Sequence, residues 1–332
     1  MKAILMTAPG APTVLQIADV PTPEIQTQTG ILVRLKAAGV NPIDTKLRQR
    51  GTFYPDQMPA ILGCDGAGIV EAVGAAVTRF QPGDEVYFCD GGLGAVTGNY
   101  GEFTVVEEHC VALKPQSLSF IEAAAVPLAL ITAWESLFDR GRLEEGRTVL
   151  IHGGAGGVGH LAVQLAKLKG ARVATTVSSP AKAAFVTELG ADLGILYRET
   201  DFVTAALDWT EGEGVDLAFD TVGGKIFEAT FPAVQIYGDL VTILQPDNTV
   251  NWKIARERNL RISLEIMLTP MLKKLTFAQK HQAQMLRESA RLFDEGKLKV
   301  YVSQVLPLEE AAQAHQLIET GSTMGKLVLA ID

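Results

Sequence analysis

The chain has 332 residues, of which 47% are hydrophobic and 20% charged, and its formal net charge is −9 at pH 7. This length exceeds one ordinary hydrophobic core, so two domains are expected, and the composition excludes a disordered or fibrous protein. The acidic balance and the scattered lysines and arginines predict no nucleic-acid partner, because phosphate binding depends on clustered basic residues.

The N-terminal residues 1–6 are soon followed by Pro9 and predict a first strand rather than a signal peptide. The most apolar stretch, residues 123–137, is interrupted by a proline and a glutamate and is too short for a membrane span. The chain has three cysteines, Cys64, Cys89 and Cys110. They form no CxxC pair and suit neither a disulfide framework nor a structural zinc lobe, so we expect a cytoplasmic protein.

Residues 1 to about 120 alternate short apolar runs with glycine and proline. The runs predicted as strands are Ile31–Leu35, Gly68–Gly74, Asp84–Phe88 and Phe103–Val106. This pattern predicts a β-rich domain of barrel type.

From Ser119, a capping candidate with Glu122 three residues on, the pattern becomes helical, and from Arg147 strands alternate with helices. The predicted strands are Thr148–His152, Arg172–Val177, Leu193–Leu196, Val215–Asp220 and Leu240–Leu244. The predicted helices are Val158–Lys169, Pro180–Leu189 and Phe202–Trp209. This order predicts an α/β fold, a doubly wound parallel sheet with helices on both faces.

The end of the chain departs from this alternation. It predicts a polar helix at 278–295, a strand at 300–305, a helix at 308–319 and a strand at 326–331. We expect these last elements to complete the first domain. The predicted domains are therefore 1–120 with about 296–332, and a nucleotide-binding domain over 121–295.

A glycine-rich turn lies between the predicted strand at 148–152 and the predicted helix at 158–169. It reads Gly154, Ala155, Gly156, Gly157, Val158, Gly159. In a dinucleotide fingerprint of this form one glycine permits the turn, one lets the backbone approach a pyrophosphate, and one lets helix and strand pack closely. The helix N-terminus then attracts phosphate charge. Glycine-rich turns also occur in structural loops, but the strand, motif, helix and further βα units together favour a dinucleotide site.

The end of the second strand of this domain bears on which dinucleotide is bound. NAD sites usually carry an acid there that bonds the ribose 2′-hydroxyl. Here the strand is followed by Ser178 and Ser179, with Lys182 one turn into the next helix. Taken alone, Lys182 is more typical of an exposed helix lysine. Together with the serines and the missing acid, it makes NADPH the better prediction, because hydroxyl and ammonium groups bind a 2′-phosphate.

Short motifs recur along nearly the whole chain. They are Ala38–Asp44, Gly63–Gly68, Gly74, Pro82–Val86, Gly101–Phe103, Ala124-Ala125, Leu130–Ala133, His152–Gly159, Gly190–Asp192 and Asp220–Gly224. In this number and order they resemble the medium-chain dehydrogenase/reductases, and within them the zinc-free quinone oxidoreductase or zeta-crystallin-like branch. The resemblance implies a GroES-like catalytic domain, a Rossmann domain, a cofactor in the cleft between them and a homodimer.

The resemblance also implies which residues surround the cofactor. Tyr197 would join Ser179 and Lys182 around the 2′-phosphate, although it is equally typical of a partly buried aromatic at a strand end. Thr132 and Asn41 would contact the cofactor near the nicotinamide. The residues implied to pass under the ring are Val222, Ile243 and Leu244. Gln245 stands where relatives often carry a smaller residue, which leaves the shape of the cleft open.

Zinc-dependent relatives place a cysteine where this chain has Asn41, a His-Glu pair where it has Cys64 and Asp65, and another cysteine where it has Leu128. One thiol and one carboxylate remain, fewer than the three protein ligands of a catalytic zinc. We therefore expect no metal. Cys64 is more typical of a small buried residue than of a ligand.

The missing zinc ligands affect which class of substrate the protein is expected to convert. Oxidising a simple alcohol requires a stabilised alkoxide, which zinc supplies as a Lewis acid. A quinone or conjugated enone delocalises its incoming charge, so hydrogen bonds suffice. The sequence thus predicts an NADPH-dependent, metal-independent reductase of small-molecule quinones or α,β-unsaturated carbonyls. A zinc-type alcohol dehydrogenase and a non-catalytic cofactor-binding protein stay as alternatives.

Three catalytic residues are implied by the resemblance. Asn41 and Tyr54 would donate to the substrate oxygen, with Asp44 nearby as an orienting group. Because Asn41 precedes Pro42, its backbone is restricted to extended conformations, and shaping a turn is its alternative role. Surface packing is the alternative for Tyr54. The loops near 48–58, 90–100 and 245–270 are expected to shape the cleft, and the substrate itself stays open.

Overall fold

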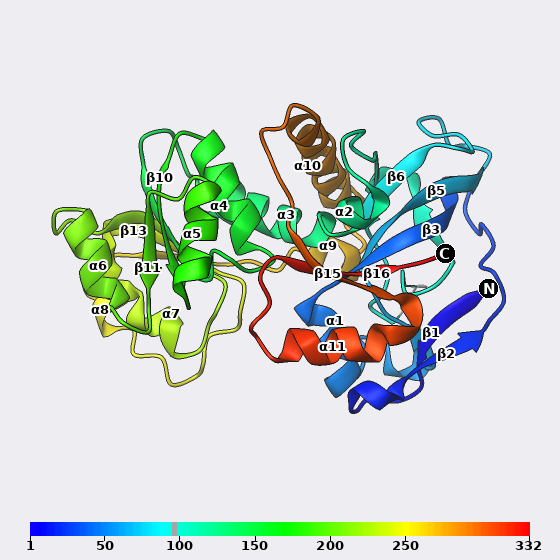
Figure 1. The fold of residues 1–332 in the computed structure, drawn as a ribbon, viewed down its shortest axis with the longest axis horizontal. Coiled ribbons are helices and arrows are strands. Elements are labelled where there is room, and N and C mark those ends of the chain that lie inside the picture. Colours follow the sequence, from blue (N-terminus) through cyan, green and yellow to red (C-terminus); the bar gives the residue numbers. More distant parts are fainter. Residues whose placement is uncertain (95–97) are drawn as a thin grey trace. The chain divides into compact units, whose positions relative to one another are not determined.

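The structure, a computed structural model, describes residues 1–94 and 98–332. Residues 95–97, part of the loop expected near 90–100, lie outside the described residues. The chain forms two compact units, one of Met1–Leu128 with Leu268–Asp332 and one of Ala129–Met267. Figure 1 colours the first unit blue to cyan-green and orange to red, and the second green to yellow.

The first unit is β-rich, as expected. Its larger sheet has the order β15 (Val302–Pro307), β16 (Lys326–Ala330), β3 (Gly30–Val40), β5 (Asp65–Val73), β6 (Glu85–Cys89), β8 (Val111–Leu113), with β7 (Phe103–Glu107) also on β3. Its smaller sheet has the order β2 (Leu15–Asp19), β1 (Lys2–Met6), β4 (Ala60–Ile61). Strand β16 pairs antiparallel with β3, so the end of the chain returns to this unit.

The helices of the first unit are α1 (Pro42–Arg50), α2 (Phe120–Ala124), α9 (Thr269–Leu272), α10 (Thr276–Asp294) and α11 (Ala311–Glu319). Helix α2 begins with the expected capping box, in which the Ser119 hydroxyl accepts from the Glu122 amide. Single turns are η1 (Pro12–Val14), η2 (Pro55–Gln57), η3 (Glu108–Cys110) and η6 (Leu308–Glu310).

Helix α10 belongs to the first unit, although the sequence placed the boundary at 295. Its apolar face includes Met285, Leu286 and Phe293, all buried, and the helix packs on η3 and β8. The Tyr87 hydroxyl of β6 donates to the Leu286 carbonyl at 2.6 Å. The sequence-based boundary differs because an amphipathic helix does not reveal which core covers its apolar face.

The second unit contains a six-stranded parallel sheet. The order is β11 (Leu193–Leu196), β10 (Arg172–Val177), β9 (Thr148–Ile151), β12 (Val215–Asp220), β13 (Val234–Thr242), β14 (Arg261–Leu264). Strand β13 begins six residues earlier than expected, after which its register on β12 shifts between Val215 and Leu217. The edge strand β14 has no predicted counterpart, because its ends Arg261 and Leu264 are both exposed and show no buried alternation.

The helices of this unit are α3 (Pro127–Trp134), α4 (Gly159–Leu168), α5 (Pro180–Glu188), α6 (Phe202–Trp209), α7 (Lys225–Ala229) and α8 (Lys253–Glu257), with the π-helix η4 (Glu135–Arg140) and the single turn η5 (Phe231–Ala233). Figure 1 shows α4 and α5 on one side of the sheet and α6 and α8 on the other. Leu150 and Ala218 of the strands pack with Phe202, Phe227 and Phe231 in the core. This is the expected doubly wound α/β sheet.

The chain leaves β9 toward β10 and β11, then crosses back to β12, β13 and β14. The direction of winding therefore reverses between β9 and β12. In open parallel sheets of this kind, ligands bind outside the carboxyl ends of the strands at such a reversal.

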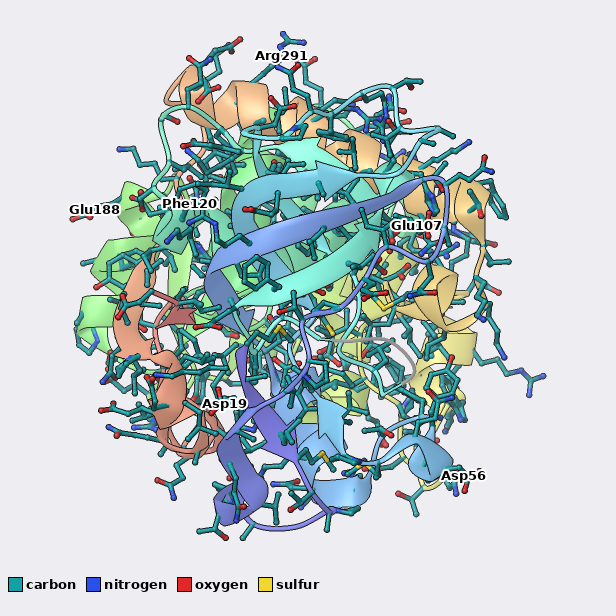
Figure 2. All side chains as sticks on the ribbon, turned by 90° about the vertical axis from the view of Figure 1, so that its right-hand side faces the viewer. Asp19, Asp56, Glu107, Phe120, Glu188 and Arg291 are labelled. Carbon is teal, nitrogen blue, oxygen red and sulfur yellow. The ribbon has the colours of Figure 1, made fainter. Side chains whose placement is uncertain are left out.

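Charged side chains lie on the surface of each unit. Figure 2 shows Asp56, Glu188 and Arg291 at the periphery, and all three are exposed. Over the described ranges, none of the helices combines the length and the apolar character needed to cross a bilayer.

Candidate functional site

The glycine turn follows β9 and leads into α4, as the sequence predicts. A Cβ on Gly154 would lie 2.0 Å from Thr175 Oγ1, and one on Gly159 would lie 2.2 Å from the Gly153 carbonyl oxygen. Both glycines are buried, so they serve the close packing of turn, strand and helix.

Gly156 differs from these two glycines. A Cβ there would meet only the Gly153 carbonyl oxygen, at 3.2 Å, and Gly156, Gly157 and Val158 are partly exposed. The backbone of these three residues thus faces open space at the N-terminus of the ten-residue helix α4, whereas Ala155 is buried. This cradle fits a diphosphate, since a helix N-terminus attracts negative charge and no side chain blocks it.

Ser178, Ser179, Lys182 and Tyr197 come together at the carboxyl ends of β10 and β11. Val177 pairs with Leu196, and the Tyr197 amide donates to the Val177 carbonyl at 3.2 Å. The Ser179 hydroxyl caps α5 by accepting from the Lys182 amide at 3.4 Å. Tyr197 is 48% exposed, which suits both a contact with the cofactor and a partly buried aromatic at a strand end.

Asp220 organises the turn that holds Val222, and sequence reasoning gave it no role. Its Oδ1 accepts from the amides of Val222 and Gly223 at 2.9 and 2.8 Å. Its Oδ2 accepts from Thr242 Oγ1 at 3.0 Å, which ties the end of β12 to the end of β13. A Cβ on Gly223 would lie 2.6 Å from the Leu244 side chain, so the turn packs closely on that residue.

Ile243 lies in the same group, because its amide donates to the Asp220 carbonyl at 3.2 Å. The structure therefore brings Val222, Ile243 and Leu244 together at the carboxyl ends of β12 and β13. Thr132 lies on α3 of this unit and is 5% exposed.

In the first unit, Asn41 belongs to a buried polar network. Its Nδ2 donates to Asp65 Oδ2 at 2.9 Å, and its Oδ1 accepts from Lys326 Nζ. Lys326 Nζ also lies 3.6 Å from Asp65 Oδ2. Asn41 is 1% exposed, Asp65 is fully buried and Lys326 is 4% exposed, so both partners of this ion pair are inaccessible to bulk water.

Asp44 is the second predicted residue of this network. Asn41 has extended backbone and caps α1, and the Asn41 amide donates to Asp44 Oδ2 at 2.8 Å. The Tyr100 hydroxyl donates to the same oxygen at 3.0 Å and lies 3.3 Å from His315 Nε2. Asn41 thus has the turn-shaping role that Pro42 suggested, in addition to its contacts with Asp65 and Lys326.

Burial raises the pKa of Asp44 to about 7, and the negative charge of Asp65 adds to this effect. Asp44 Oδ1 has no hydrogen-bond partner among the described residues, which is consistent with a neutral carboxyl at slightly acid pH. Burial lowers the pKa of His315 to about 3, so its imidazole is neutral. Burial also raises the pKa of Asp65, and the Lys326 ammonium opposes this rise.

Of the four positions at which the resemblance implies zinc ligands in zinc-dependent relatives, Asn41, Asp65 and Leu128 are joined by hydrogen bonds in this chain. Asp65 Oδ1 accepts from the Leu128 amide at 2.8 Å, while Oδ2 is shared by Asn41 and Lys326. Burial raises the pKa of the Cys64 thiol well above its usual value. No group of three His, Cys, Asp or Glu residues within 1–94 and 98–332 is arranged to hold a metal. These residues do not fit a catalytic zinc, which needs three available ligands.

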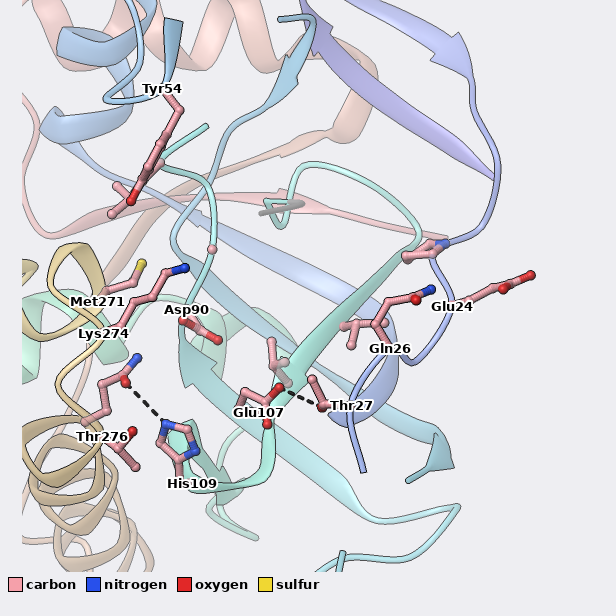
Figure 3. Close-up of a pocket in the computed structure, with 16 residues that line it drawn as sticks. Glu24, Gln26, Thr27, Tyr54, Asp90, Glu107, His109, Met271, Lys274 and Thr276 are labelled. Carbon is pink, nitrogen blue, oxygen red and sulfur yellow. Dashed lines mark hydrogen bonds between the residues drawn. The ribbon is translucent and has the colours of Figure 1, made fainter. Parts of the chain in front are cut away.

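Tyr54 lies apart from this network, on the wall of a pocket of about 660 Å³ within the first unit. It precedes the single turn η2, and its amide donates to Thr52 Oγ1 at 3.3 Å. Figure 3 shows Tyr54 at one end of the pocket, on the same side as Met271 and Lys274. The structure thus brings Asn41 and Asp44 together and places Tyr54 with a different set of residues.

Sequence reasoning missed Lys326, Tyr100 and His315, and treated Asp65 only as a replaced metal ligand. Lys326 and Asn41 are separated by 285 positions, and Tyr100 and His315 by 215. No local pattern reveals such pairs. The one available signal is that Lys326 begins a strand whose following residues are all apolar through Ile331.

Comparison with known proteins shows to which family the chain is similar. Residues 27–116 match the alcohol dehydrogenase GroES-like domain, and residues 189–329 match a family described as zinc-binding dehydrogenase. The quinone oxidoreductase of Pseudomonas aeruginosa is 35% identical over 331 residues, which cover 99% of both chains. The 2-methylene-furan-3-one reductase of Solanum lycopersicum is 33% identical over 341 positions, covering 99% of this chain and 79% of that one.

Two solved structures are similar over the full length of both chains. The Escherichia coli quinone oxidoreductase complexed with NADPH has a TM-score of 0.88 and 30% identity. An NAD-dependent alcohol dehydrogenase has a TM-score of 0.89 and 34% identity. The fold and the glycine turn define an oxidoreductase of the dinucleotide-binding class. The chain belongs to the medium-chain dehydrogenase/reductase family, as the motifs predicted, and the quinone oxidoreductases are among its relatives.

Proposed function

We propose that this protein is an NADPH-dependent reductase that transfers hydride to a quinone or α,β-unsaturated carbonyl without a metal. The observation that carries the proposal is the combination of an intact dinucleotide turn with a first unit in which Asn41 and Asp65 are bonded to Lys326 and do not fit a catalytic zinc. Similarity to a quinone oxidoreductase and to a furanone reductase supports the acceptor class.

The second unit offers suitable partners for each part of NADPH. The backbone from Gly154 to Gly159 would hold the diphosphate. The 2′-phosphate would be held by Ser178, Ser179, Lys182 and Tyr197, since no carboxylate at the end of β10 would repel it. Thr132, Val222, Ile243 and Leu244 would lie near the nicotinamide. When bound, NADPH supplies a hydride at that ring.

In the first unit, Tyr54 would donate a hydrogen bond to the acceptor from the pocket wall, and Asn41 would donate one from the buried network. The bonds to Lys326 and Asp65 fix both ends of the Asn41 carboxamide, which leaves the second hydrogen on Nδ2 in a defined direction. Asp44 orients the Asn41 backbone through the bond to its amide. Fixed donors of this kind stabilise a developing enolate or hydroquinone anion without reorganisation.

The test is NADPH oxidation by metal-free protein with three acceptors, namely 1,4-benzoquinone, a 2-alkenal and an enoyl thioester. We expect turnover with a quinone or enone after dialysis against a chelator, and no stoichiometric zinc by elemental analysis. Activity that appears only with added zinc, on simple alcohols, would instead support the zinc-type alcohol dehydrogenase.

A further inference from the structure

The pocket beside Tyr54 lies entirely within the first unit. Its volume of about 660 Å³ is in the range of small-molecule sites. Figure 3 shows it extending from Tyr54, Met271 and Lys274 toward Glu24 and Gln26, with Asp90 and Glu107 between these ends. It therefore has room for more than one quinone ring.

The pocket wall and the buried network adjoin along the chain at the end of β6. Cys89, the last residue of β6, pairs with Asp65. The next residue, Asp90, lines the pocket, and its amide donates to the Cys64 carbonyl at 2.9 Å. The pocket thus begins one residue beyond the strand position that faces Asp65.

Part of the pocket wall is apolar. Leu93 and Val106 are 4% and 2% exposed, and Val105 and Met271 line the same space. An alkyl or prenyl chain placed against these side chains would be removed from contact with water. Each buried methylene then strengthens binding by about fourfold.

The charged side chains of the wall are three acids, Glu24, Asp90 and Glu107, and one base, Lys274. The Glu107 carboxylate is held by the hydroxyls of Thr27 and Thr29 at 2.7 and 2.6 Å. Asp90 also lines the pocket, and burial raises its pKa to about 6, so it is mainly ionised at pH 7. An anionic group entering between these carboxylates meets like charge at short range, which is unfavourable in a partly buried site.

We propose that this pocket binds the side chain of the acceptor and selects an uncharged apolar tail, as in alkyl- or prenyl-substituted quinones and long 2-alkenals. It disfavours acceptors with anionic tails, including coenzyme A thioesters. The proposal rests on the proposed function, because it assigns the acceptor head group to the Tyr54 end.

The test is anaerobic calorimetry with three hydroquinones, namely the unsubstituted compound, a hexyl derivative and a derivative whose chain ends in a carboxylate. The hexyl compound is expected to bind at least about tenfold more tightly than the unsubstituted one, and the carboxylate is expected to remove most of this gain. Equal affinity for all three compounds would overturn the proposal.

Two pairs of variants locate the effect. Met271→Trp fills the pocket and should abolish the preference for the hexyl tail, whereas Leu168→Trp on the exposed face of α4 should leave it unchanged. The double change Asp90→Asn with Glu107→Gln should strengthen binding of the carboxylate-ended compound by roughly tenfold. The control variant, Asp19→Asn with Glu188→Gln, removes the same charge from exposed positions outside the pocket. It should leave binding of the carboxylate-ended compound unchanged. Equal effects from the pocket and control pairs would overturn the assignment.

These binding measurements need no hydride transfer. Reduction of unsubstituted 1,4-benzoquinone by NADPH tests the proposed function separately. If that reduction occurs and the tail has no effect, the pocket assignment fails alone. If tails bind as expected and no acceptor is reduced, the proposed function fails, and the preference of the pocket for an apolar tail stands.

Discussion

The Lys326 ammonium donates to the carboxamide oxygen of Asn41, 285 positions away in the chain. The same nitrogen lies 3.6 Å from Asp65, whose other carboxylate oxygen accepts from the Leu128 amide. One buried cation therefore contacts both Asn41 and Asp65. These bonds, with that of the Leu128 amide, keep a buried carboxylate in a fixed place.

Removal of Lys326 should be costly. In Lys326→Met, Asp65 stays buried without its cation, which should lower the free energy of unfolding by about 3 kcal/mol. Urea unfolding at pH 7 measures this. Combining Lys326→Met with Asp65→Asn should recover part of the loss, because the buried charge is then gone. A change of less than about 0.5 kcal/mol in the single variant would show that the pair is not formed as described.

Asp44 should make stability depend on pH. Its pKa is about 7 in the folded protein, above the usual value of 3.8, so the folded state binds the proton more tightly than the unfolded state does. The stabilising effect of the neutral carboxyl is present below pH 4 and is lost as the pH rises toward 7.

Asp44→Asn removes this titration and keeps an acceptor for the Asn41 amide and the Tyr100 hydroxyl. The free energy of unfolding of the variant minus that of the natural protein should therefore be larger at pH 8 than at pH 5, by about 2 to 3 kcal/mol. Burial raises the pKa of the facing Tyr100 hydroxyl well above its usual value, and Asp65 is present in both proteins. Chemical unfolding at the two pH values measures the difference, and a pH-independent difference would contradict the assignment.

Lys182 should discriminate between cofactors. Lys182→Ala removes a charged partner of the 2′-phosphate and should weaken NADPH binding by roughly tenfold or more, while NADH affinity changes little. Fluorescence quenching titrations measure both affinities. Lys253→Ala, an exposed lysine on α8 of the same unit, serves as the control. Equal losses for NADPH and NADH would show that Lys182 does not face the extra phosphate.

Alanine substitutions at two glycines of the turn should have different effects on stability and on cofactor binding. Gly154→Ala places a methyl 2.0 Å from Thr175 Oγ1 and should destabilise the protein by about 2 kcal/mol. Gly156→Ala meets only one carbonyl oxygen at 3.2 Å, so it should fold with nearly normal stability and weaken cofactor binding instead. Thermal unfolding and cofactor titration separate the two effects. Similar stability losses in both variants would contradict these different roles.

Local patterns predicted much of the second unit. Strands β10, β11 and β12 have the expected bounds, because each is a short apolar run between turn residues. The resemblance implied that Tyr197 would join Ser179 and Lys182, and these residues follow the carboxyl ends of the neighbouring strands β10 and β11. The edge strand β14 was missed, and so was the early start of β13, where Ile236 and Tyr237 are exposed and lie within the register shift.

The first unit was less predictable. Its buried network joins Asn41, Asp65, Tyr100, His315 and Lys326, which come from five separate segments of the chain. Such pairings arise from the return of β16 to β3 and the packing of α11, not from spacing along the sequence. The roles of Asn41, Tyr54 and Asp44 in catalysis therefore stay predictions.

The most direct test of the central claim compares kcat/KM for NADPH and NADH with 1,4-benzoquinone, using chelator-treated protein shown to be zinc-free. We predict turnover without metal and a preference for NADPH of roughly tenfold or more, because serine, lysine and tyrosine replace the acid at the ends of β10 and β11. A preference for NADH, or activity that requires added zinc, would contradict it.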